Sequence, residues 1–65
     1  MRITLSNSAG ATLAVVPVTV DSDGCLCADH PLYFCEIESA LCAHRETRAL
    51  TGTLPEYGAF WTVTL

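Results

Sequence analysis

The chain has six side chains that could ligate zinc or act in nucleophilic catalysis: Cys25, Cys27, His30, Cys35, Cys42 and His44. Structural zinc sites usually pair their cysteines as C-x2–4-C, because one turn of backbone then presents both sulfurs to the ion. Here the closest cysteines form C-x-C, and only Cys27 and His30 have a suitable interval. Cys35 and Cys42 lie about 10.5 Å apart along a predicted helix, which is too far for one zinc ion. The spacing therefore predicts no metal and no other cofactor.

The redox state of these thiols follows from the expected compartment. The longest apolar run, residues 13–20, is interrupted by a proline and a threonine and leads into an acidic turn, so it does not resemble a signal peptide. We expect a cytoplasmic protein, whose thiols stay reduced and partly buried. A Cys35–Cys42 disulfide is excluded within an intact helix, because the two Cα atoms must come within about 7 Å. A bond from Cys25 or Cys27 to Cys35 stays open.

No set of residues in the chain forms a recognisable catalytic site. Catalysis by cysteine requires a nearby base, an oxyanion site and a pocket for substrate. A chain of 65 residues has little volume for a pocket once its core is filled. His44 falls on the apolar stripe of the predicted helix, and His30 belongs to the start of that helix. We therefore predict no catalytic residue and no enzyme.

Residues 3–44 contain no lysine or arginine but five carboxylates, which are Asp21, Asp23, Asp29, Glu36 and Glu38. Turn chemistry explains the first two, and Asp29 is expected to cap the helix. Glu36 and Glu38 are two apart on the helix and point in different directions, which excludes a paired acid and base. Together the five are expected to form one negative edge that binds a partner, with Tyr33 and Leu32 as apolar anchors.

The charge balance restricts the class of partner. The net charge is -4, the chain has no lysine, and its three arginines are Arg2, Arg45 and Arg48. Such a chain has no basic surface for phosphates, so direct binding to nucleic acid or to an anionic membrane is disfavoured. A basic groove, such as that of a nucleic-acid-binding protein, is the natural electrostatic complement. The alternative is an acidic surface that only keeps a chain with 51% hydrophobic residues soluble.

Two strands are expected before the helix. Residues 2–6 alternate polar and apolar side chains, the period of a half-buried strand, and residues 7–10 form a turn cluster. Residues 11–20 are rich in β-branched side chains and predict a second strand. Pro17 cannot donate to a ladder, so this strand should lie at a sheet edge or carry a bulge there. Residues 21–24 then form a turn.

A single helix is expected from Leu32 to about Arg45, with Asp29 as its N-cap and Pro31 in the first turn. At 100° per residue, one apolar stripe contains Tyr33, Phe34, Ile37, Ala40, Leu41 and His44. Residues 47–54 and 59–65 predict two further strands joined by a turn at 55–58. Trp61, Val63 and Leu65 are expected on one face of the last strand.

These elements predict an α+β fold of order β-β-α-β-β in one domain, residues 1–65. One amphipathic helix packs on a mostly antiparallel four-stranded sheet. We expect this small acidic domain to be a monomer.

The chain as a whole resembles the anti-CRISPR proteins of bacteriophages, and among them an inhibitor of type I-C systems. The resemblance rests on length, the opening residues Met1-Arg2-Ile3-Thr4-Leu5, acidity and the β-β-α-β-β order. It implies a protein of the bacterial cytoplasm that binds the surveillance complex at the large subunit that reads the PAM. There, negative charge would occupy the place of phosphates and exclude target DNA.

Two other functions stay open. One is an acidic interaction module, such as an antitoxin or an assembly factor, that neutralises another basic partner. The other is a metal- or redox-responsive switch built on Cys25, Cys27 and Cys35.

Overall fold

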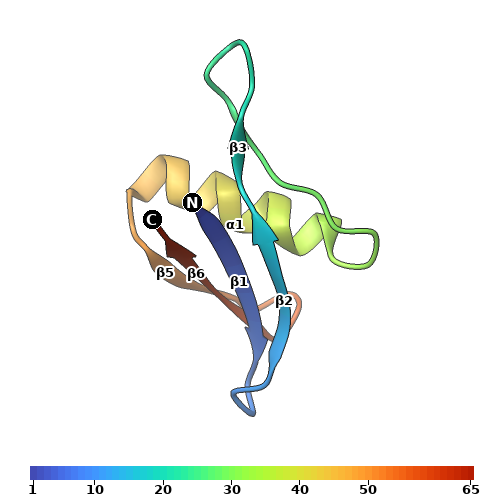
Figure 1. Cartoon of the computed structure of the whole chain (residues 1–65). Coiled ribbons are helices and arrows are strands. Elements are labelled where there is room, and N and C mark those ends of the chain that lie inside the picture. The colour runs from blue at the N-terminus through green and yellow to red at the C-terminus, as the bar shows by residue number, and fades with distance from the viewer.

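A computed structural model describes all 65 residues as one helix on a four-stranded sheet, with a small second sheet beside it (Figure 1). The main sheet is antiparallel throughout and has the order β2-β1-β6-β5. Its strands are β1 (Arg2–Asn7), β2 (Thr12–Pro17), β5 (Thr51–Leu54) and β6 (Ala59–Thr64). The helix is α1 (Phe34–Thr47), and the second sheet pairs β3 (Thr19–Val20) with β4 (Leu26–Cys27). The predicted α+β fold is confirmed.

The core lies between α1 and one face of the main sheet. Ile3 and Leu5 of β1 alternate with polar residues and are fully buried, as is Ile37 of α1. Each such side chain stabilises the fold by about 1.5–3 kcal/mol through its removal from water. The other members of the core are Ala14, Val16, Val18, Ala40, Leu41, Leu54, Ala59, Trp61 and Val63.

The other face of the main sheet is left uncovered. Thr4 of β1 lies opposite Val15 on one side and Thr62 on the other, and Thr62 lies opposite Thr51. Threonine is β-branched and polar, so it favours an extended strand whose side chains meet water. One helix therefore suffices to cover the apolar face of this sheet.

The turn at residues 7–10 forms as predicted. The Asn7 side chain accepts hydrogen bonds from the backbone N–H groups of Ala9 and Ala11, both at 3.0 Å. Gly10 has a φ of +84°, a conformation that glycine adopts without a steric penalty. This turn fixes where β2 begins.

The second predicted strand, residues 11–20, is wrong in its extent. β2 ends at Pro17, and the chain leaves the main sheet to form β3 in the second sheet. Pro17 does lie in an edge strand, as expected from its missing N–H. The irregularity in pairing falls between Leu5 and Ser6 instead of at the proline.

The predicted start of the helix is also wrong. α1 begins after Tyr33, which makes no side-chain capping bond, and Asp29 is not the N-cap. The residues between them are held by His30, whose Nδ1 accepts hydrogen bonds from the backbone N–H groups of Leu32 at 3.2 Å and Tyr33 at 3.3 Å. Asp29 is thereby left without a structural role in the helix.

The helix also ends later than expected. It continues to Thr47, and Arg48, with a φ of +60°, donates its backbone N–H to the carbonyl of His44. β5 therefore begins at Thr51, and the expected strand over 47–54 is shortened. Phe34 and Leu65 are exposed although the sequence pattern placed both on buried faces.

Candidate functional site

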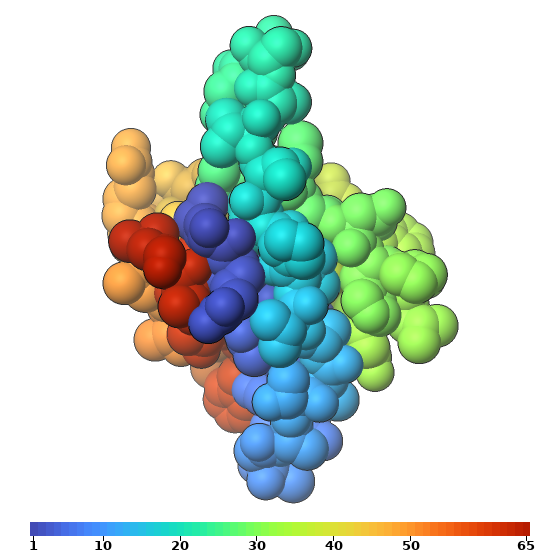
Figure 2. Space-filling view, viewed as in Figure 1, coloured from blue at the N-terminus to red at the C-terminus, as the bar shows by residue number.

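The hairpin made by β3, β4 and the turn between them, residues 19–27, projects from the body of the protein; we call it the arm (Figures 1 and 2). It contributes to the elongation of the molecule, whose principal extents are 37, 25 and 20 Å. Val20 is 62% exposed on the arm, whereas Leu26, opposite it, packs against the core. The arm thus presents an apolar side chain and acidic residues, without any lysine or arginine.

Asp21 organises the turn at the tip of the arm. Its Oδ1 accepts hydrogen bonds from the backbone N–H groups of Asp23 and Cys25, each at 2.9 Å. These bonds hold the pKa of Asp21 below its usual value, and the bond from Cys25 has the largest effect. Gly24 completes the turn with a φ of +81°. Asp23 is exposed beside it, so the tip carries one carboxylate that builds the turn and one that faces solvent.

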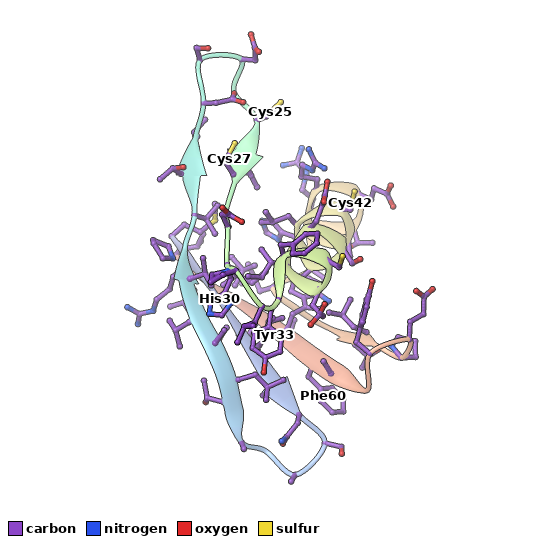
Figure 3. All side chains as sticks on the ribbon, turned by 90° about the vertical axis from the view of Figure 1, so that its right-hand side faces the viewer. Cys25, Cys27, His30, Tyr33, Cys42 and Phe60 are labelled. Atoms are coloured by element: carbon purple, nitrogen blue, oxygen red, sulfur yellow. The ribbon has the colours of Figure 1, made fainter.

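The cysteines do not lie where the sequence placed them. All four are free and exposed, which corrects the expectation of partly buried thiols. The core is filled by aliphatic residues, alanine and Trp61 instead. Figure 3 shows Cys25 and Cys27 on the arm and Cys42 on α1.

The Cys27 thiol is held in its protonated form. Its sulfur lies 3.7 Å from Oδ2 of Asp21. Desolvation, followed by the negative charge of Asp21, raises the pKa of Cys27 above its usual value. A thiol with a raised pKa is a poor nucleophile at neutral pH, because only the thiolate attacks.

A cleft of about 350 Å³ separates the arm and the segment after it from α1; we call it the arm cleft. The arm side supplies Leu26, Cys27, Ala28 and Asp29, and the helix supplies Phe34, Glu38, Leu41 and Arg45. Five of its eight lining residues are hydrophobic, and the other three supply two carboxylates and one guanidinium. That composition suits a binding site for a side chain with an apolar stem and a charged end.

Arg45, which also lines the cleft, bonds to a thiol and makes no ion pair with these carboxylates. Its Nη2 donates to the sulfur of Cys42 at 3.3 Å, one helical turn back. This hydrogen bond is the first cause of the raised pKa of Arg45.

The structure divides the predicted partner-binding residues into three places. Asp21 and Asp23 lie at the tip of the arm, and Asp29 and Glu38 line the arm cleft. Glu36 is partly buried outside the cleft lining, so the five carboxylates do not form one continuous edge.

Tyr33 is held against the body of the protein instead of projecting as an anchor. It is partly buried and packs against the core. The ring of His30 lies over it with centroids 5.3 Å apart (Figure 3). Leu32, 76% exposed, is the apolar neighbour that does project.

Phe34 and Arg45 line the cleft but were not among the predicted site residues. The pattern at 100° per residue placed Phe34 within the apolar stripe, but the structure leaves it 56% exposed. The positions 34, 38, 41 and 45 share a face, and this spacing was the available signal.

His44 has a structural role. Its Nδ1 lies 2.7 Å from the carbonyl oxygen of Ala49, and its ring meets Trp61 edge-on with centroids 6.3 Å apart. These contacts fix the end of α1 over the sheet.

Comparisons with known proteins add no relative. No protein-family model matches the chain, and neither a curated protein nor a solved structure is significantly similar to it. The single helix has 14 residues and is not long and apolar enough to cross a membrane.

Proposed function

We propose that this protein is an inhibitory binding module that uses its acidic arm to occupy the nucleic-acid groove of a basic partner. The observation that carries the proposal is the arm itself, a projecting hairpin with carboxylates at its tip and no basic residue. A hairpin of this shape can enter a groove that a flat surface would only cover. Its negative charge accelerates encounter with a positive surface and favours the correct orientation.

The particular target that we propose is the surveillance complex of type I-C CRISPR systems, in the bacterial cytoplasm. The resemblance in length, acidity and element order to the anti-CRISPR proteins supports this choice. In such a complex the subunit that reads the PAM holds duplex DNA through basic residues. The arm would occupy that groove, so the complex would not bind target DNA.

The test measures binding of target DNA to the purified type I-C complex, with and without this protein added beforehand. Loss of DNA binding, together with co-elution of the 7.0 kDa chain, is the expected result. Intact DNA binding with lost degradation would place the action at nuclease recruitment instead. If the protein neither co-elutes nor changes binding or degradation, the type I-C target is wrong.

A pair of charge-matched variants tests the role of the arm. Asp21→Asn combined with Asp23→Asn removes two negative charges from the tip, and the new amide at position 21 keeps an oxygen in the Oδ1 position for the turn. Glu46→Gln combined with Glu56→Gln removes the same charge from exposed positions outside the arm. We expect the first pair to slow association with the complex and the second to change it little. If both double variants slow association equally, the net charge of the protein and not the position of the carboxylates on the arm determines the association rate.

The exposure of all four thiols supports a second candidate function, a cysteine-based metal or redox switch. Against it, the structure has no group of three or more metal-binding side chains. Native mass with and without a chelator, and a thiol count before and after mild oxidation, test this candidate. A stoichiometric metal, or loss of two thiols with retained fold, would favour it over the arm.

A further inference from the structure

The arm cleft contains one aromatic side chain that the rest of the chain leaves exposed. Phe34 is 56% exposed at the start of α1, and it lines the cleft together with Leu26 and Leu41. An aromatic ring in an open cleft provides a flat apolar surface for a ligand.

Two carboxylates lie at the same cleft. Asp29 is exposed because His30, and not Asp29, holds the turn that precedes the helix. Glu38 is exposed one turn after Phe34 on the same face of α1. The one cation of the cleft, Arg45, donates to Cys42 Sγ. Asp29 and Glu38 are exposed and make no hydrogen bond or ion pair within the chain, so they are available to a cation from outside.

We infer that the arm cleft receives an arginine side chain of the basic partner. The stem of that arginine would lie along Leu26 and Leu41, its planar guanidinium on the ring of Phe34, and its N–H groups toward Asp29 and Glu38. This inference rests on the proposed function, since it names the group on the partner that the protein recognises.

Arginine fits this cleft better than lysine does. A guanidinium stacks on an aromatic ring and offers donors in a planar fork that carboxylates accept in pairs. It is also less strongly hydrated than an ammonium group, so its transfer into a partly apolar cleft costs less. The cleft should therefore discriminate between two residues of equal charge.

Peptide titrations followed by NMR test the inference without the CRISPR complex. Hexa-arginine, hexa-lysine and hexa-citrulline are each added to the labelled protein, and the backbone amide shifts are recorded. We expect hexa-arginine to shift the amides of residues 26–29 and of the cleft face of α1, with hexa-lysine weaker and hexa-citrulline without effect. Equal binding of the two cationic peptides, or shifts confined to the arm tip, would overturn the inference.

Two variants of the cleft and one control variant provide the second part of the test. Asp29→Asn with Glu38→Gln should weaken hexa-arginine about fivefold, the effect of about 1 kcal/mol expected for exposed ion pairs. Phe34→Leu should reduce the preference for arginine over lysine. Glu46→Gln with Glu56→Gln, the charge-matched control, should leave the affinity within about twofold. An equal loss in the control would overturn the inference.

The same variants separate this inference from the proposed function. If the arm-tip variants weaken binding to the type I-C complex and the cleft variants do not, the cleft inference is wrong and the proposed function stands. If hexa-arginine binds the cleft as expected but the protein does not bind the complex, the type I-C target is wrong and the cleft binds another basic partner.

Discussion

Substitution of Gly52 by alanine should destabilise this protein more than any other change of one methyl group on its surface strands. Gly52 lies in the edge strand β5, directly opposite Trp61 of β6. A Cβ atom built on Gly52 would lie 2.6 Å from Nε1 of Trp61 and 2.7 Å from Cε2 and Cζ2. Carbon atoms in contact prefer about 3.5–4.0 Å, so the indole or the strand must move by roughly 1 Å. Glycine is required here because the ring lies flat against the backbone.

The indole has little room in which to move. Trp61 is 2% exposed, and the ring of His44 meets it edge-on. Overpacking of this kind typically costs about 1–3 kcal/mol. For a domain of this size each kcal/mol lowers the melting temperature by roughly 4–8 °C. We therefore expect Gly52→Ala to melt at least about 4 °C below the parent protein.

Thermal unfolding followed by circular dichroism and by tryptophan fluorescence measures this effect. Trp61 is the one tryptophan of the chain, so its emission reports directly on the strained position. Thr53→Val, a change of similar size at an exposed position of the same strand, is the control and should shift stability by about 0.5 kcal/mol or less. A melting temperature for Gly52→Ala within the error of the parent protein, with unchanged emission, would refute the packing of Trp61 over Gly52.

Three further results are expected at the arm. Asp21→Ala should increase hydrogen exchange at the amides of residues 23 and 25, whereas Asp21→Asn should change it less, because the amide oxygen can still accept both bonds. The pKa of Asp21 is lower in the folded arm than in the unfolded chain, so its stabilising effect is present above about pH 3.9 and is lost as the pH falls through the lower folded pKa. The NMR shifts of the amides of residues 23 and 25 should titrate at that folded pKa. A midpoint at or above the unfolded pKa would contradict this prediction. Iodoacetamide should modify Cys27 slowly at pH 8, and faster in Asp21→Asn, because the carboxylate helps to raise the pKa of the thiol. Peptide mass spectrometry measures both rates on proteins in which Cys25, Cys35 and Cys42 are replaced by serine.

The fold could be predicted from the sequence where local chemistry and periodicity agree. The alternation along β1 and β6 and the apolar positions of α1 fixed the two layers of the core. The turns at 7–10 and 21–24 formed as expected because Asn7 and Asp21 bond to the backbone two and four residues ahead. In these places each interaction lies within a few residues, so a sequence window contains both partners.

The differences arise where the partner is distant or where two residues compete for one role. Asp29 is a good N-cap by type, but the ring of His30 takes over the neighbouring amides and shifts the helix start to Phe34. Phe34 is exposed because the arm, which could have covered it, projects away and leaves a cleft. The close approach of Trp61 to Gly52 joins residues nine apart on adjacent strands, and no local pattern indicates it.

The candidate site could be predicted in its residue types but not in its arrangement. The absence of basic residues from 3–44 identified the acidic surface. It did not indicate that Asp29 is released from the helix cap, or that it lines a cleft together with Glu38. The release of Asp29 depends on the competition with His30 for the amides before the helix, and its place at the cleft depends on contacts between segments distant in sequence.

The arm tip and the arm cleft should act on a partner as two independent groups of charge. Residues 25–28, which connect them through β4, span about 13 Å at 3.3 Å per residue. At physiological ionic strength charges are screened beyond about 8 Å, so the tip and the cleft interact weakly with one another. Neutralisation of Asp23 and neutralisation of the pair Asp29 and Glu38 should therefore have additive effects on the free energy of binding. A measured coupling above about 0.5 kcal/mol in the triple variant would mean that both groups meet the same basic cluster, and that the arm bends toward α1 when it binds.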